Sequence, residues 1–186
     1  MGSFLSSRMW VLIIILISLS ACRSGGPDSL MVVDDVVDRE VSLHMFSSVN
    51  RGGNEYAMSD FRAKYRNLSL VFLQDGCAPC YPKFIEWHEK MEQIITGEDY
   101  TVLFIINARH YSNFIHNARI YGEVEERYYH VMDPNNRFII SNSGIPRYLI
   151  DRSLLIDHSN RVRMIGEPFF NSDMTKVFHI VTGVEN

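Results

Sequence analysis

The expected architecture follows from residues 69–87, which read Ser69-Leu-Val-Phe-Leu-Gln-Asp-Gly-Cys77-Ala-Pro-Cys80-Tyr-Pro-Lys-Phe-Ile-Glu-Trp87. The nearly continuous apolar run from Leu68 to Leu73 predicts a short strand that is covered on both faces. Polar residues and a glycine interrupt this run just before the first cysteine. From Pro82 onward, apolar residues recur at helical spacing with charged residues between them, which predicts an amphipathic helix. The two cysteines are therefore expected at the N-terminus of a helix that follows a buried strand.

The position of the cysteines indicates redox chemistry. Unpaired N–H groups and the helix dipole favour negative charge at a helix N-terminus, which lowers the pKa of a thiol and raises its thiolate fraction. Cys77 comes first and is expected to be the more exposed, so we assign it as the nucleophile. Cys80 is expected to resolve a mixed disulfide by forming the Cys77–Cys80 disulfide. Pro79 fixes one backbone angle between them and should tune the turn geometry and the redox potential.

The N-terminal segment predicts export and lipidation. Arg8 precedes an apolar run from Met9 to Leu19, and small residues then lead to Cys22. This order matches a bacterial lipoprotein signal, with residues 1–21 as the signal peptide and Cys22 as the lipid-bearing N-terminus. Residues 22–31 then form a lipidated, flexible tether, and residues 32–186 form the folded domain. An uncleaved membrane anchor, or a simple signal peptide with a chance cysteine, is the alternative.

Cysteine number and charge limit the function further. The chain has 3 cysteines, so a lipid on Cys22 leaves only Cys77 and Cys80. A disulfide that closes so small a ring removes little entropy from the unfolded chain, so the pair indicates chemistry or metal binding. The net charge of −4 and the absence of a basic patch argue against a nucleic-acid partner.

The remaining patterns predict strands and helices on both sides of this motif. Strands are expected at residues 32–37, 41–46 and 100–107, and a short strand or loop at residues 129–134. The glycines within residues 51–54 predict a turn between strands. Paired strand segments at residues 149–156 are expected to turn at residues 158–161 into a strand at residues 162–165, which makes an antiparallel hairpin. Residues 58–65 predict a short helix capped by Ser59 or Asp60, residues 110–128 a second helix, and residues 169–181 a capped, amphipathic last helix. A strand, a helix and a second strand of this kind make a parallel βαβ unit with a right-handed crossover.

The order of these features resembles a thioredoxin-like fold. The closer likeness is to the thioredoxin-like lipoproteins grouped with the AhpC/TSA and TlpA-like families, including those of Bacteroidota. The resemblance covers residues 36–181 and rests on Cys77-Ala-Pro-Cys80 and on Ile145-Pro146 before Tyr148-Leu-Ile-Asp151. It implies an α/β, three-layer fold in which helices flank a central mixed β-sheet. It also implies thiol–disulfide oxidoreductase activity without a cofactor or a metal.

The resemblance implies further site residues. Pro146 should form a cis peptide bond and pack against the Cys77–Cys80 pair, and Ile145 should offer backbone groups to a substrate. With Ala78 and Pro79, Ile145 makes up the predicted substrate-binding set. The helix at residues 110–128 should cover the sheet face opposite the active-site helix.

The sequence departs from the family pattern at three positions. Val71 stands where thioredoxins carry a buried aspartate, Gly76 where an aromatic residue precedes the first cysteine, and Lys83 where several TlpA-like reductants carry an acid. The proton acceptor for Cys80 is therefore unassigned, and Asp75 and Glu86 are the nearest carboxylates in sequence.

The leading hypothesis is a thiol–disulfide oxidoreductase that acts on the thiols and disulfides of exported proteins. The resemblance favours a reductant, which implies a membrane redox partner that recycles the pair. The lipid anchor would hold the domain at a bacterial membrane, facing the periplasm. The alternatives are a module that binds Cu(I) or zinc, for which no second Cys-X-X-Cys is present, and a non-catalytic lipoprotein binding domain. A thiol peroxidase would need a different sequence around Cys77.

Overall fold

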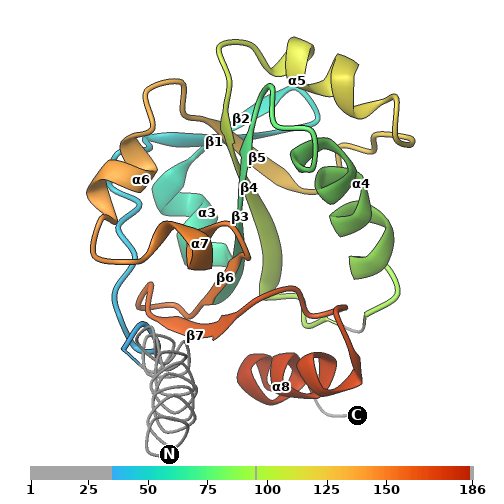
Figure 1. Ribbon diagram of the computed structural model, residues 1–186. Coiled ribbons are helices and arrows are strands. Elements are labelled where there is room, and N and C mark those ends of the chain that lie inside the picture. The colour runs from blue at the N-terminus through green and yellow to red at the C-terminus, as the bar shows by residue number, and fades with distance from the viewer. Residues whose placement is uncertain (1–34, 95, 185–186) are drawn as a thin grey trace, which may run out of the picture. The chain divides into compact units, whose positions relative to one another are not determined.

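A seven-stranded mixed sheet organises the protein (Figure 1). The computed structural model describes residues 35–94 and 96–184, and residues 35–186 form one compact unit. The predicted signal peptide, Cys22 and the tether lie outside the described residues. Within the described residues, no helix is both long enough and apolar enough to span a membrane.

The strand order in the sheet is β2-β1-β5-β4-β3-β6-β7. The strands are β1 (Ser48–Arg51), β2 (Asn54–Ala57), β3 (Asn67–Gln74), β4 (Tyr100–Asn107), β5 (Tyr129–Met132), β6 (Leu154–Ile156) and β7 (Val162–Ile165). The helices are α3 (Met58–Lys64), α4 (Cys80–Met91), α5 (Tyr111–Ala118), α6 (Arg137–Ser141), α7 (Arg147–Ile150) and α8 (Ser172–Thr182).

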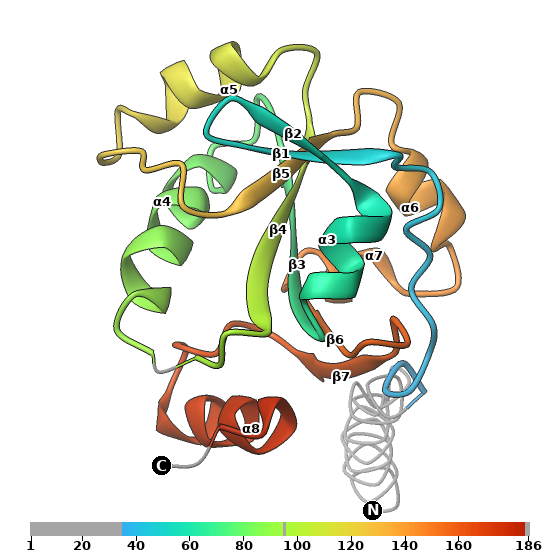
Figure 2. The ribbon, with the colours of Figure 1, turned by 180° about the vertical axis from the view of Figure 1, so that it is seen from behind.

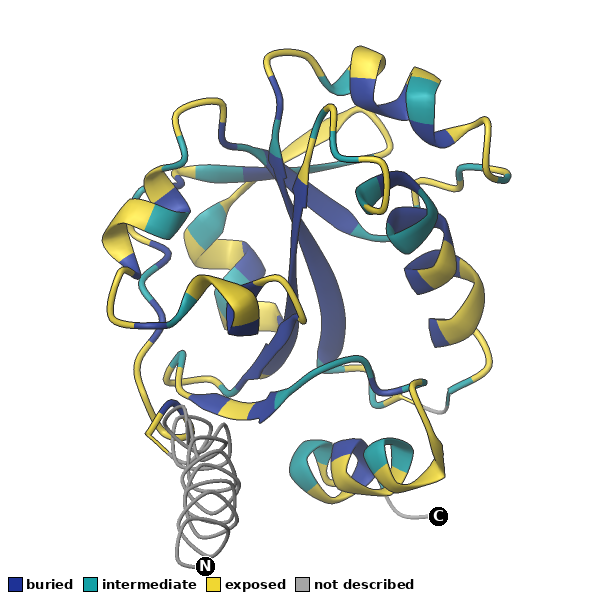
Figure 3. Ribbon diagram, viewed as in Figure 1, coloured by how far each residue is buried: buried dark blue, intermediate teal, exposed yellow. Residues whose placement is uncertain are grey.

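The predicted parallel pair at the centre of the sheet is confirmed. β3 and β4 run parallel in register from Asn67↔Tyr100 to Gln74↔Asn107, and β5 continues the parallel set on the far side of β4. β6 pairs antiparallel with β3, and β7 pairs antiparallel with β6, as the predicted hairpin requires. Both central strands are buried along almost their whole length (Figure 3). Continuous apolar sequence is what such doubly covered strands need.

Helices cover both faces of the sheet. Figures 1 and 2 show α4 and α5 on one side and α3, α6 and α7 on the other. Successive strand residues point to opposite faces, so Val71 and Phe104 join the cluster beneath α4, whereas Phe72 stacks on Phe138 of α6 on the other side. α8 packs on the α4 side, where Phe178 meets Tyr100 edge to face.

The helix expected at residues 110–128 is shorter than predicted and covers the other face. α5 ends at Ala118, and Phe114 and Ile115 lie in the same apolar cluster as Phe84 of α4. The chain beyond α5 passes so close to α4 that a Cβ on Gly122 would lie 2.6 Å from Ile85 Cγ2. A glycine at position 122 allows this close packing. The chain packs against α4 here as an irregular segment, where the prediction had continued the helix to residue 128. The prediction that this helix lies opposite α4 is wrong.

Two predicted N-terminal strands are also wrong where the structure describes them, from residue 35 onward. Residues 35–47 form turns and irregular chain, apart from a single bridge between Glu40 and Arg161. Their apolar side chains are nevertheless buried, including Val41 and Phe46. The alternation of apolar residues therefore reflects burial of a segment that runs along the edge of the domain. The hairpin of β1 and β2 follows around the predicted glycine turn.

The sequence predicts side-chain N-caps for α3 and α8, and the structure confirms the cap of α8 alone. Asn171 precedes α8, and its side chain accepts a hydrogen bond from the Met174 backbone N–H at 2.9 Å. α3 instead begins after Ala57, without a side-chain cap, so neither Ser59 nor Asp60 has the predicted role.

Candidate active site

The Cys77–Cys80 disulfide lies in the turn between β3 and α4. Figure 1 shows this turn as the connection from the end of β3 to the start of α4. Cys80 is the first residue of α4, and Cys77 precedes the helix by one turn of chain. The two Cα atoms are 5.4 Å apart, a separation that a disulfide normally spans. Both cysteines are half-buried, while Ala78 and Pro79 between them are exposed. The structure thus joins the two cysteines that the sequence singles out and leaves the dipeptide between them accessible.

The backbone of the turn is fixed on both sides of the cysteines. The Cys77 N–H donates to the Gln74 carbonyl at 3.3 Å, and the Cys80 N–H donates to the Cys77 carbonyl at 3.0 Å. Gly76 adopts a φ of 78°, which residues with a side chain rarely adopt. Pro79 is the N-cap residue of α4 and has a φ of −73°, close to the value that its ring imposes.

A cleft of about 350 Å³ opens beside the disulfide. It is bounded by the end of β3, the start of α4 and helix α7. Its lining residues are Phe72, Gln74, Cys77, Pro79, Cys80, Lys83, Arg147 and Asp151. A disulfide at the wall of an open cleft is accessible to a second thiol.

Charged side chains connect α4 with α7 across this cleft. Lys83 Nζ donates to the Asp151 carbonyl at 2.6 Å and pairs with Glu167 Oε1 at 3.0 Å. Arg147 Nε bonds Asp151 Oδ1 at 2.7 Å, and the Arg147 guanidinium lies 4.4 Å from the centre of the Phe72 ring. A cation close to a cysteine favours the thiolate over the thiol. Lys83 lines the cleft together with both cysteines, and there its ammonium is paired with the Glu167 carboxylate.

The sequence patterns did not identify Arg147 and Asp151 as site residues. Both lie about seventy positions from the cysteines, and nothing in the local pattern links them to Cys77. The one sequence feature that could have identified them is their spacing of four residues, which favours an ion pair when the segment is helical. That signal predicts the pair but not its place in the fold.

The two carboxylates nearest in sequence lie outside the cleft lining. Asp75 Oδ1 accepts a hydrogen bond from the Tyr81 hydroxyl at 2.7 Å. Glu86 is exposed on α4 and lines a neighbouring depression with Pro79 and Pro82. Neither is positioned by these contacts as the proton acceptor for Cys80.

The structure corrects two expectations for the Ile145–Pro146 pair, the cis peptide bond and the strand that follows it. The Ile145–Pro146 peptide bond is trans, as are all peptide bonds among the described residues. Pro146 precedes α7 instead of a strand, and its carbonyl accepts hydrogen bonds from the N–H groups of Leu149 and Ile150. The Ile145 side chain is buried, and its N–H is already bonded to the Asn142 carbonyl at 2.9 Å.

The strand expected after Pro146 begins several residues later. β6 starts at Leu154, and the residue before it is Ser153. Ser153 is buried and has a φ of 94°. α7 therefore occupies the interval that was assigned to a strand, and it brings Arg147 and Asp151 to the cleft beside the cysteines.

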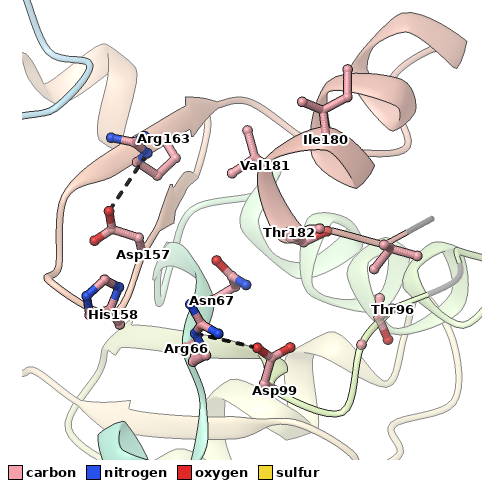
Figure 4. A pocket seen from close by; sticks show the side chains of 13 residues that line it. Arg66, Asn67, Thr96, Asp99, Asp157, His158, Arg163, Ile180, Val181 and Thr182 are labelled. Atoms are coloured by element: carbon pink, nitrogen blue, oxygen red, sulfur yellow. Dashed lines mark ion pairs between the residues drawn. The ribbon is translucent and has the colours of Figure 1, made fainter.

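A larger cavity, of about 610 Å³, lies at the opposite end of the central strands (Figure 4). Asn67, the first residue of β3, lines it, together with residues of the β6–β7 turn and of α8. Its charges are paired within the cavity, Arg66 with Asp99 at 3.9 Å and Arg163 with Asp157 at 3.8 Å. We assign it no part in the chemistry of the cysteines.

Comparison with known proteins identifies the fold. A proposed protein disulfide isomerase from Bacteroides thetaiotaomicron aligns with a TM-score of 0.50 and 17% identity over 78% of this chain and 87% of its own. A proposed electron transfer protein from Aquifex aeolicus aligns with a TM-score of 0.51 and 12% identity over 73% and 93%. A thioredoxin from Wuchereria bancrofti has a TM-score of 0.48 and 15% identity over 72% and 94%. The fold is thioredoxin-like.

The sequence comparisons add no closer relative. Neither the protein-family models nor the curated proteins give a match. The thioredoxin-like fold therefore stands on the structure, and the chemistry stands on Cys77 and Cys80, which occupy the turn between a central strand and a helix in this fold.

Proposed function

We propose that the protein is a thiol–disulfide oxidoreductase that acts on exported proteins. The observation that carries this proposal is the Cys77–Cys80 disulfide at the N-terminus of α4, in the wall of an open cleft. The helix N-terminus favours a thiolate at this place. A disulfide that closes so small a ring contributes little to stability, so its presence is better explained by exchange chemistry.

The reaction proceeds by two exchanges. In the reducing direction, the Cys77 thiolate attacks one sulfur of a substrate disulfide, forms a mixed disulfide and releases the other substrate sulfur as a thiolate. The Cys80 thiolate then attacks Cys77 Sγ, the Cys77–Cys80 bond forms, and the second substrate sulfur leaves. The substrate gains two electrons and the protein becomes oxidised.

The cellular setting is part of the proposal. The lipoprotein-like signal before Cys22 supports lipid anchoring at a bacterial membrane, with the domain facing the periplasm. A reductant in that compartment needs electrons, so we propose a membrane redox partner that returns Cys77 and Cys80 to thiols.

A redox titration tests both the activity and its direction. The Cys77–Cys80 pair is followed in dithiol buffers of defined potential. A reduction potential near that of thioredoxin, about −270 mV, is the expected result for a reductant, whereas a value near about −120 mV would identify an oxidant. If no reversible disulfide forms, the oxidoreductase assignment is wrong. Copper or zinc that co-purifies in that case would favour the metal-binding alternative, although no group of three or more potential ligands exists among the described residues.

The surface next to the cysteines predicts a preference for protein substrates. Phe170 is 75% exposed and lines a depression of about 350 Å³ that shares Pro79 and Lys83 with the disulfide cleft. Phe169 before it is held by an edge-to-face contact with Trp87 at 5.1 Å, which leaves Phe170 directed outward. Exposed aromatic residues of this kind contribute strongly to protein contacts.

Phe170→Ala is expected to lower kcat/KM for a protein disulfide about fivefold, which corresponds to the loss of roughly 1 kcal/mol of contact energy. The rate with a small disulfide, such as oxidised glutathione, should stay the same because a small molecule does not reach Phe170. Ile180→Ala is the control, since Ile180 is 79% exposed but lines the distant cavity. Equal losses with both kinds of substrate would contradict a docking role.

A further inference from the structure

Four residues form a hydrogen-bond network around the redox turn, which we call the Tyr81 network: Asp75, Gly76, Tyr81 and Asn117. The Tyr81 hydroxyl donates to Asp75 Oδ1 at 2.7 Å and accepts from the Gly76 N–H at 2.7 Å. Asn117 Nδ2 donates to the same hydroxyl at 3.2 Å and to Asp75 Oδ1 at 3.4 Å. A hydroxyl has one donor and two acceptor positions. All three are used here.

The network joins the two ends of the segment that carries the cysteines. Asp75 and Gly76 come immediately before Cys77, and Tyr81 comes immediately after Cys80. The Tyr81 hydroxyl therefore links the chain on either side of the pair without involving either sulfur atom. Opening the disulfide therefore breaks none of its hydrogen bonds.

The anchor of the network lies in the core. The Tyr81 side chain is buried, and its ring packs at 5.3 Å from the Phe114 ring and stacks at 6.3 Å on Tyr121. Asn117 comes from α5, the helix that packs beside α4. The hydroxyl is thus held by two helices, so it fixes the position of Asp75 and Gly76 relative to α4.

The hydrogen bonds of the turn and of the Tyr81 network are independent of the disulfide. The hydrogen bonds from the Cys80 N–H to the Cys77 carbonyl and from the Cys77 N–H to the Gln74 carbonyl, like those of the Tyr81 network, involve no sulfur atom, so none of them has to break when the disulfide opens. Gly76 lies in this segment with a φ of 78°, and a glycine has more accessible backbone conformations than any other residue. Without the Tyr81 hydroxyl, the chain before Cys77 would gain conformational freedom that ring closure must remove again.

We propose that Tyr81, with Asp75 and Asn117, is a positioning residue that keeps Cys77 and Cys80 close enough for rapid disulfide closure. The step it accelerates is the attack of the Cys80 thiolate on Cys77 Sγ in a mixed disulfide. The Cys77–Cys80 bond forms, the bond from Cys77 to the substrate breaks, and the substrate sulfur leaves with the electron pair and takes a proton from water. This inference rests on the proposed function, because it concerns the second exchange of that reaction.

The test compares two tyrosine variants that each lose one buried hydroxyl. Tyr81→Phe removes the centre of the network and keeps the ring. Tyr100→Phe is the matched control, because the Tyr100 hydroxyl donates to Ser69 Oγ at 2.9 Å in the same apolar cluster but away from the cysteines. The full protein is equilibrated with reduced and oxidised glutathione, which gives the effective concentration of the two thiols. The decay of a glutathione adduct on Cys77 gives the rate of closure.

Tyr81→Phe is expected to lower both the effective concentration and the closure rate about tenfold, the effect of losing one to two net hydrogen bonds. Tyr100→Phe should change both by less than about twofold at a comparable loss of stability. Equal values in the two variants would overturn the positioning role while leaving the oxidoreductase assignment intact. If the wild-type protein forms no reversible disulfide with glutathione, the proposed function itself fails.

A second variant applies if Tyr81→Phe does not fold. Asn117→Ala removes two of the four hydrogen bonds and leaves the Tyr81 ring in place. Asn117 is only half-buried, so the substitution spares the core. A fall of about threefold in the closure rate supports the proposal, and a wild-type rate overturns it.

Discussion

Cys77→Ser is expected to abolish the oxidoreductase activity, with a loss of at least about 1,000-fold, because a serine hydroxyl does not attack a disulfide at neutral pH. Cys80→Ser should also stop turnover, but at a different stage. Its Cys77 still attacks a substrate, and the mixed disulfide then persists because no second thiol displaces it. The two variants therefore differ in what accumulates. Covalent adducts are expected with Cys80→Ser alone.

The measurement has two parts. Reduction of a protein disulfide by the purified protein reports activity, and non-reducing gels with mass spectrometry report adducts and the cysteine that carries them. Cys22→Ser is the matched control, since it makes the same substitution outside the redox turn and should keep full activity on a soluble substrate. Equal loss in both active-site variants without trapped substrate would contradict the assigned roles. Adducts on Cys80 in the Cys77→Ser variant would reverse them.

The central part of the fold could be predicted because its sequence signals are local. β3 and β4 each contain a mostly apolar run of six or more residues that is rich in branched and aromatic side chains, which favours a strand covered on both faces. The start of α4 was predictable for a similar reason, since helical spacing begins next to the cysteines. Because both faces of the central strands are buried, both need apolar side chains, and this requirement is visible in the sequence.

The region around Pro146 could not be predicted from the same kind of signal. Leu149 and Ile150 are both buried, although they are adjacent. A short apolar run of this kind fits a strand and a helical turn equally well. The structure forms α7 there, because the Pro146 carbonyl and the following N–H groups close a helical turn, and β6 begins only after Ser153.

The residues that complete the site come from distant parts of the chain. Arg147 and Asp151 reach the cysteines through the packing of α7 against the start of α4, and Asn117 reaches Asp75 through the packing of α5 against α4. These contacts depend on which side of the sheet each helix covers. For α5 the family resemblance implied the wrong face of the sheet. The contact between Asn117 and the redox turn depends on that face, so the local sequence could not predict it.

His130 gives the protein a second measurable property, a loss of stability in acid. It lies in β5, is buried, and stacks on Tyr111 with 3.7 Å between ring centroids and 6° between the ring planes. Burial lowers the pKa of His130 to about 4 from the ordinary value of 6.5. The folded protein therefore keeps His130 neutral at pH values where the unfolded chain has already protonated it. His88 is buried beneath Tyr128, and burial lowers its pKa as well.

The direction of the effect follows from proton linkage. Between pH 6.5 and about pH 4, the unfolded chain binds more protons than the folded protein, so stability rises with pH in this window. Above pH 6.5 His130 is neutral in both states, so its protonation costs the folded protein no stability. As the pH falls from 6.5 toward 4, protonation of the unfolded chain lowers the free energy of unfolding. At 1.36 kcal/mol for each pH unit, the loss in the free energy of unfolding approaches roughly 3 kcal/mol.

Urea unfolding at several pH values between 7 and 4 measures this loss. Carboxylates also titrate near the lower limit, so the informative quantity is the difference between wild type and His130→Phe. Phenylalanine keeps an aromatic ring against Tyr111 but has no ring nitrogen to protonate. The variant is therefore expected to lose less stability than the wild type on acidification, by up to roughly 3 kcal/mol at pH 4. Parallel curves for the two proteins would show that His130 is protonated in the folded state without penalty, and that its burial has no electrostatic cost.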